Sequence, residues 1–164
     1  MTESRHRNAE RVVEAGAKLG IEVIPVRFPD GTKTAADAAA AIGCDVAQIV
    51  KSLIFAVDGE VVLAYVSGAN QLDEAKLAVA AGGVRCSRVD ADVVRSATGF
   101  PIGGVPPFGH DTELRVFIDP DLLGHEVVWA AAGTWHDVFA IEPQRLVEAS
   151  GGQVALLARD ERPA

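Results

Sequence analysis

The sequence predicts one domain of the α+β class, built from a mixed sheet with flanking helices. The chain has 164 residues, of which 49% are hydrophobic and 5% aromatic, so an aliphatic core of about one domain is expected. Short apolar runs joined by hairpin signals alternate with helical patterns, which favours a mixed sheet over a doubly wound parallel one. No repeat, low-complexity tract or linker divides residues 1–164, so no second domain is predicted.

The N-terminal quarter predicts two helices around one short strand. Apolar residues recur at helical spacing over 4–19 and a glycine follows. Residues 21–26 read as a strand, and their proline favours an edge position. A turn over 29–31 leads to an Ala-rich helix over 34–43, which opens with a Thr-x-x-Asp capping pattern and ends near a glycine.

The centre of the chain predicts an antiparallel hairpin. Apolar runs over 49–57 and 61–67 flank Asp58-Gly59-Glu60, a strong hairpin turn signal. The segments that follow read in order as a helix over 73–81, a strand over 84–89 and a helix over 90–97 that begins at an aspartate and ends before Gly99.

The C-terminal part predicts a second hairpin-like pair. Two short apolar strands, 116–118 and 127–131, are separated by a turn region over 119–121. The remaining segments read as a strand over 138–141, a helix from Pro143 to about 149 and a strand over 154–157 that closes the sheet.

The charge balance restricts the partners. A formal charge of -8 and a pI near 4.9 argue against binding to long duplexes, and no DNA partner is predicted. The basic cluster Arg5, His6, Arg7 and Arg11 is read as a solvated helix face in preference to a phosphate contact.

Several familiar chemistries lack sequence support. Cys44 and Cys86 have no ligand spacing, and neither a disulfide nor a metal site is predicted. Dinucleotide, P-loop, zincin and nucleophile-elbow motifs do not occur, and no cofactor is expected. The polar N-terminus and the lack of a spanning apolar stretch predict a cytoplasmic protein that does not enter a membrane.

Two features do not fit an ordinary core. Lys51 interrupts the apolar run 49–57, where a buried ammonium needs an anionic partner, a wet cavity or a changed protonation state. The loop Gly103–Gly109 combines glycines, which let a ligand approach backbone N–H groups, with stiffening prolines. Together they suggest a preformed anion or carbonyl site. The bland alternatives are a snorkelling lysine and a Pro/Gly turn without a ligand.

The chain resembles the YbaK family of aminoacyl-tRNA deacylases, which includes the editing domain of bacterial prolyl-tRNA synthetases. Four segments carry the resemblance, and their order spans roughly residues 34–146. It implies a freestanding hydrolase that removes a wrong amino acid from tRNA, and a mostly antiparallel sheet that curls toward a barrel. The segments are 50–55, 72–77, 98–109 and Ala132-Gly133.

The resemblance also implies a site. Lys51 matches the family's functional lysine and Gly103–Pro107 its Gly-x-x-x-Pro loop, so Lys51, Gly103 and Gly104 are the predicted catalytic residues. The glycine N–H groups would stabilise the oxyanion. Lys51 would orient the tRNA end or, alternatively, act as a base. The predicted substrate-binding residues are Ser52, Val105, Pro106, Pro107, Phe108, Thr134 and His136.

The predicted partner is the acceptor end of a mischarged tRNA, with a prolyl-tRNA synthetase as a further candidate partner. The segment 133–137 departs from many relatives, which leaves the amino-acid preference open. Two other functions remain: a noncatalytic module that binds an aminoacyl-tRNA end in a synthetase complex, and an esterase for small acyl esters. Trans-editing is favoured because size alone discriminates amino acids only weakly.

Overall fold

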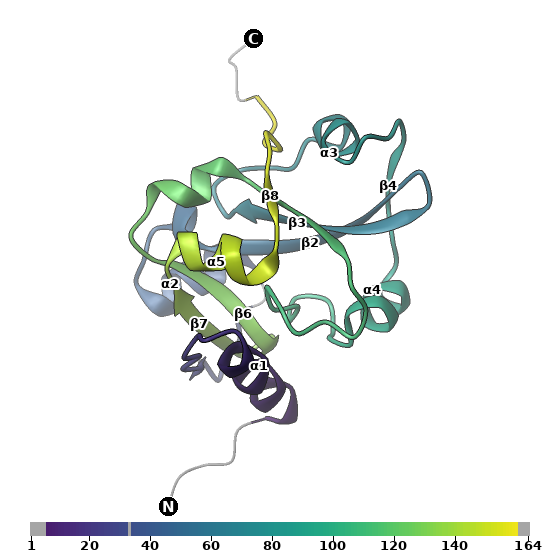
Figure 1. The fold of residues 1–164 in the computed structure, drawn as a ribbon. Coiled ribbons are helices and arrows are strands. Elements are labelled where there is room, and N and C mark those ends of the chain that lie inside the picture. The colour runs from purple at the N-terminus through teal and green to yellow at the C-terminus, as the bar shows by residue number, and fades with distance from the viewer. Residues whose placement is uncertain (1–5, 33, 161–164) are drawn as a thin grey trace, which may run out of the picture.

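Two sheets with flanking helices form the fold (Figure 1). The computed structural model describes residues 6–32 and 34–160. The larger sheet has the order β4 (Cys86–Arg88), β2 (Val50–Val57), β3 (Glu60–Ser67), β5 (Arg115–Ile118) and β8 (Gln153–Val154); the smaller has the order β1 (Val26–Arg27), β7 (Asp137–Ile141) and β6 (Val128–Thr134). The helices are α1 (Arg7–Lys18), α2 (Ala35–Ile42), α3 (Glu74–Ala80), α4 (Ala91–Thr98) and α5 (Pro143–Ser150), with 3-10 turns η1 (Val46–Gln48) and η2 (Pro120–Gly124).

The α+β class and the mostly antiparallel pairing are confirmed. Strands β2, β3 and β4 pair antiparallel, as do β1, β7 and β6, whereas β5 pairs parallel with β3 and β8. The described strands form two sheets and not one closed barrel.

The central hairpin forms as predicted. Strands β2 and β3 pair without a break from Val57↔Glu60 to Val50↔Ser67. The two turn residues Asp58 and Gly59 both have positive φ, 50° and 87°, which is the backbone conformation that joins twisted strands in a two-residue turn. This long hairpin fixes the position of Lys51, one residue into β2.

Side-chain caps begin the helices α2 and α4, and a glycine cap ends α4, where the sequence predicts. Thr34 accepts a hydrogen bond from the Asp37 N–H at the start of α2, and Asp90 accepts one from Val93 at the start of α4. Gly99 ends α4 in the left-handed conformation. The predicted first helix extended to Ser4, which lies outside the described residues, as does Arg5.

Two predicted strand arrangements are wrong. Within 21–26 only Val26 enters a ladder, as the first residue of β1, because Ile21 and Val23 bury their side chains in the core without backbone pairing. The predicted hairpin of 116–118 with 127–131 does not form: β5 lies beside β3, and η2 redirects the chain so that β6 joins the smaller sheet.

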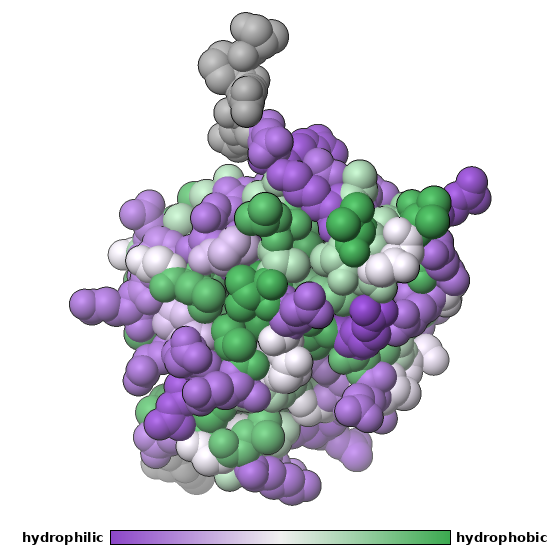
Figure 2. Space-filling model, turned by 45° about the horizontal axis from the view of Figure 1, so that its top comes forward, coloured by the Kyte–Doolittle hydropathy of each residue, from purple (hydrophilic) through white to green (hydrophobic). Residues whose placement is uncertain are grey.

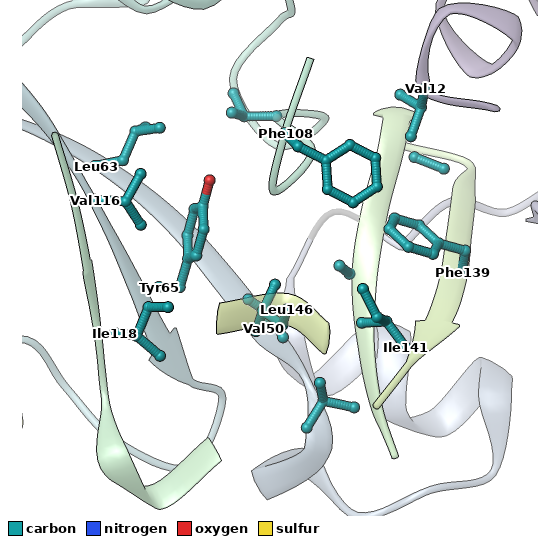
Figure 3. Packing of buried hydrophobic residues seen from close by; sticks show 14 of the residues in the cluster. Val12, Val50, Leu63, Tyr65, Phe108, Val116, Ile118, Phe139, Ile141 and Leu146 are labelled. Atoms are coloured by element: carbon teal, nitrogen blue, oxygen red, sulfur yellow. The ribbon is translucent and has the colours of Figure 1, made fainter. Parts of the chain in front are cut away.

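The main core lies between the two sheets (Figure 3). Tyr65 of the larger sheet and Phe139 of the smaller are both fully buried, and Phe108 packs edge-on against Phe139 with ring centroids 5.9 Å apart. A second cluster fills the other face of the larger sheet, beneath α3, around Leu77 and Leu157. The two clusters make β3 a strand buried on both faces.

The basic residue Arg11 ties α1 to the end of α4. Its guanidinium donates to the Gly99 carbonyl oxygen at 2.8 Å, pairs with Asp111 at 3.1 Å and lies 4.2 Å from the centre of the Phe100 ring. These contacts give Arg11 a structural role, whereas the sequence alone predicts that its basic cluster is a solvated helix face.

The surface mixes hydrophilic and hydrophobic side chains, as the face in Figure 2 shows. Within the described residues, no helix combines the length and apolar character that crossing a bilayer requires. Those residues also include no cluster of three or more His, Cys, Asp or Glu side chains placed to hold a metal ion, and both cysteines are free thiols.

Candidate functional site

A cavity of about 450 Å³ opens where the two sheets separate. A single bridge between Ile49 and Trp129 joins the start of β2 to β6, and beyond it β2 has no neighbour on that side until β4 begins opposite Phe55. The start of α2 and the loop after α4 complete the walls. The lining is mostly apolar, and Lys51 is its only charged side chain among the described residues.

The stretch of β2 before Phe55 pairs with β3 on one side only, and its other side directs a peptide group toward the cavity. The Asp58 N–H donates to Arg85 on the β4 side of the strand, and backbone groups alternate sides along a strand. The N–H and C=O of Ser52 therefore point to the same side as those of Asp58, before β4 is there to receive them. Extended backbone polar groups are thus available to a ligand.

Lys51 is partly buried, and its ammonium donates a hydrogen bond to the backbone carbonyl of Asn70. Burial lowers the pKa of Lys51 below its usual value, and the negative charge of Asp119 acts in the opposite direction. A cation in a mostly apolar cavity is a strong local attraction for an anionic group, because little water screens it.

Ser52 lies on the opposite face of β2 from Lys51, as the alternation of a strand predicts. Its Oγ is buried and has no hydrogen-bond partner among the described residues. A buried hydroxyl without a partner is costly, and here it belongs to a residue that lines the cavity.

The loop after α4 begins with a tight turn beside the cavity. The Gly104 N–H donates to the Pro101 carbonyl at 2.9 Å, and Gly103 has a φ of 82°, which is the pattern of a type II turn with glycine at its third position. The Trp135 indole N–H donates to the Ile102 carbonyl at 2.5 Å. Because the C=O and N–H of a trans peptide point in opposite directions, this bond turns the Gly103 N–H away from the indole.

The buried Tyr65 and the partly buried His110 hold the rest of the loop. The Tyr65 hydroxyl donates to the Pro107 carbonyl at 2.9 Å, and in Figure 3 it points toward the segment that carries Phe108. His110 Nε2 lies 2.7 Å from the Pro106 carbonyl oxygen. Burial raises the pKa of Tyr65 and lowers the pKa of His110, so both rings are favoured in their neutral forms. The loop is therefore preorganised.

The structure distributes the predicted site residues over three places. Lys51, Ser52, Gly103 and Val105 line the cavity. Buried behind the turn are Gly104, Pro106, Pro107 and Phe108, and the Gly104 N–H is used within the turn, which leaves Gly103 as the glycine N–H for a ligand.

The two predicted residues of the β6–β7 turn have partners outside the cavity. Thr134 Oγ1 donates to Asp137 at 2.5 Å, and His136 Nδ1 lies 3.1 Å from the Phe28 carbonyl oxygen. Trp135, between them, is the residue of this turn that reaches the glycine loop.

Sequence reasoning did not find several residues of the site. Ala35 and Ala38 of α2, with Trp129 and Ala130 of β6, line the cavity. Their sequence signals are those of an ordinary helix and an ordinary strand. Only the packing of α2 and the bridge between β6 and the start of β2 bring them to the cavity that Lys51 lines.

The fold and the cavity define a class of protein, a small α+β domain with a mostly apolar pocket that is lined by a lysine and by a glycine turn. The chain belongs to the aminoacyl-tRNA editing domain family, whose model matches residues 29–149. The suspected YbaK-type resemblance is thereby confirmed at the level of the family.

Individual relatives agree with this membership. The chain is 31% identical over 127 residues to the uncharacterized protein YwhH of Bacillus subtilis (strain 168), covering 77% of this chain and 81% of that protein. It is 35% identical over 107 residues to a proline--tRNA ligase of Maridesulfovibrio salexigens, covering 65% of this chain but only 18% of the ligase. A solved structure of a candidate trans-editing enzyme for prolyl-tRNA synthetase superposes with a TM-score of 0.90 at 42% identity, covering 96% of this chain and all of that one.

Proposed function

We propose that this protein is a freestanding deacylase that hydrolyses the ester bond of a mischarged aminoacyl-tRNA and releases the amino acid and the tRNA. Membership of the editing family supports a tRNA substrate. The observation that carries the proposal is the cavity itself, which both Lys51 and Gly103 line. Such a substrate is made in the cytoplasm, so the proposal places the protein there.

The proposed reaction needs little machinery, because an aminoacyl ester is already activated. A water oxygen attacks the ester carbonyl carbon, and the carbonyl oxygen becomes an oxyanion. The oxyanion then re-forms the carbonyl, the bond to the ribose oxygen breaks, and a proton given up by the water ends on that ribose oxygen. The Gly103 N–H, directed by the Trp135 bond to Ile102, is the proposed oxyanion donor.

Lys51 is proposed to hold the tRNA end through its terminal phosphate or ribose oxygens, which converts binding energy into orientation of the ester. The alternative role as a general base requires the neutral amine. The lowered pKa of Lys51 makes that form more accessible than for an exposed lysine, and therefore keeps this role open.

The test is a deacylation screen. Purified protein is incubated with tRNAs mischarged with Ala, Cys, Ser or Thr, and release of the amino acid is followed against buffer alone. We expect multiple turnovers on at least one of these substrates. Tight binding without hydrolysis over many equivalents would instead identify a noncatalytic module, and hydrolysis that deacylated tRNA does not inhibit would identify an esterase that ignores tRNA.

A substitution of Trp135 tests the orientation of the turn. Trp135→Phe keeps an aromatic ring over Gly103 but removes the N–H that fixes the Ile102 carbonyl. We expect kcat for deacylation to fall about tenfold with a smaller change in KM, because misplaced groups cost up to about a hundredfold in rate. Unchanged kcat, with the unfolding temperature also unchanged, would show that the turn keeps its orientation without this bond.

A further inference from the structure

We propose that Asp119, acting together with Asn70, is the positioning residue that holds Lys51 as an ammonium ion aimed at the substrate. This inference rests on the proposed function, since it assigns a task to the surroundings of the same lysine. It concerns residues that neither line the cavity nor belong to the segments on which the family resemblance depends.

Asp119 is 1% exposed and lies directly after β5. Its Oδ2 accepts hydrogen bonds from the Ser67 N–H at 3.1 Å and from Asn70 Nδ2 at 2.8 Å, while its Oδ1 accepts from the Asp121 N–H at 2.9 Å. These three donors are all uncharged. The carboxylate is thus held by three hydrogen bonds in a buried place, where a nearby cation interacts with it strongly.

Lys51 is that cation, and Asn70 connects the two groups. The Asn70 side-chain amide donates to Asp119 and also to Asp121 Oδ2 at 2.8 Å, while its backbone carbonyl accepts from the Lys51 ammonium. The only hydrogen-bond acceptor that the described residues offer Lys51 is therefore a neutral carbonyl. Asp119 supplies the charge, and Asn70 supplies the contact.

This arrangement leaves the Lys51 ammonium able to bind a substrate group. A direct ion pair with Asp119 would satisfy Lys51 and compete with a substrate anion for it. Because Asn70 lies between them, Asp119 stabilises the positive charge of Lys51 without occupying the N–H donors of the ammonium. A substrate phosphate or ribose oxygen can then be the first charged or polar ligand that Lys51 meets from the cavity side.

Other charges near this network pair elsewhere. A hollow of about 340 Å³ adjoins Asn70 and Asp119 and is also lined by charged side chains. Lys76 pairs with Asp160 at 3.1 Å, and Arg159 donates to the Gln71 side chain at 3.2 Å. Asp121, which is exposed, contacts Asn70. The charge that acts on Lys51 to a resolved extent within the described chain is that of Asp119.

The test compares Asp119→Asn with Asp121→Asn. Both changes replace a carboxylate that accepts from Asn70 Nδ2, but only the first removes the charge that acts on Lys51. The titration of Lys51 is followed by NMR of lysine carbons labelled with ¹³C, and its resonance is assigned by its loss in Lys51→Arg. We expect Asp119→Asn to lower the pKa of Lys51 further, because burial then acts without the opposing negative charge.

Hydrolysis gives the second readout. If Lys51 works as an ammonium, the single-turnover rate of Asp119→Asn, after subtraction of uncatalysed hydrolysis, declines at a lower pH than that of wild type. Asp121→Asn retains the wild-type profile. A uniform loss at every pH, with an unshifted Lys51 titration, would show that Asp119 merely caps η2, and it would overturn the inference.

A further variant covers the case in which Asp119→Asn does not fold. Asn70→Ala keeps the backbone carbonyl but removes the bridge to Asp119, and we expect about a tenfold lower single-turnover rate from a misplaced ammonium. A wild-type rate in this variant would contradict the inference. If the wild-type protein hydrolyses no mischarged tRNA, the proposed function fails, yet the NMR titrations still decide whether Asp119 maintains the charge of Lys51.

Discussion

Replacing Lys51 with methionine is expected to slow deacylation at least about a hundredfold, a loss comparable to that caused by removing one preorganised electrostatic group in other enzymes. Methionine retains an apolar stem in the cavity wall but has no ammonium. Single-turnover hydrolysis with enzyme in excess measures the loss directly. Some loss of stability is expected, because the change also removes the cation that stabilises the buried Asp119 carboxylate.

The matched control is Lys18→Met. Lys18 lies in the last turn of α1, is exposed and has no part in the cavity. We expect Lys18→Met to hydrolyse and to unfold like wild type. A Lys51→Met protein that retains hydrolysis within about threefold of wild type would remove Lys51 from the mechanism.

Replacing Gly104 with alanine is expected to reduce hydrolysis by about ten- to a hundredfold and to destabilise the fold by about 1–3 kcal/mol. A Cβ at this position would lie 2.9 Å from both the Gly133 carbonyl oxygen and the Thr134 Cα, which are backbone atoms of β6. The turn would have to move away from the strand. Gly103, the adjacent residue, would move with it and lose its place beside the cavity.

Gly124→Ala is the control for this prediction. Gly124 ends η2, and a Cβ there meets no atom within 4 Å. Deacylation rates and thermal unfolding measured on both variants separate a specific clash from a general effect of alanine. Equal behaviour of the two variants would mean that the loop adapts and that its close approach to β6 has no catalytic importance.

Local signals in the sequence were sufficient for much of the fold. The Asp58-Gly59 turn and the caps at Thr34, Asp90 and Gly99 act through neighbouring backbone groups, so short motifs determine them. The failure at 116–131 has a nonlocal cause. Strand β5 pairs with β3, about fifty residues earlier, and apolar content alone does not distinguish that partner from the nearer β6.

The site likewise contains residues that local sequence signals reveal and residues that only the structure reveals. Lys51 and Gly103 are conspicuous because an ammonium in an apolar run and a glycine turn violate local expectations. Trp135 and Asp119 have ordinary sequence surroundings, and their importance depends on where other segments bring Ile102 and Asn70. Residue types alone identified Lys51 and Gly103, whereas Trp135 and Asp119, which hold their surroundings, could be identified only from the three-dimensional structure.

The bridge between Ile49 and Trp129 joins the two sheets at one edge of the cavity. One wall belongs to β2 and the opposite wall to β6, so the width of the pocket follows the angle at which two separately hydrogen-bonded layers meet. The side chains packed between the layers, including Tyr65 and Phe139, therefore help to set that width. Substitutions between the layers can therefore change the width of such a pocket while the residues that line it stay the same.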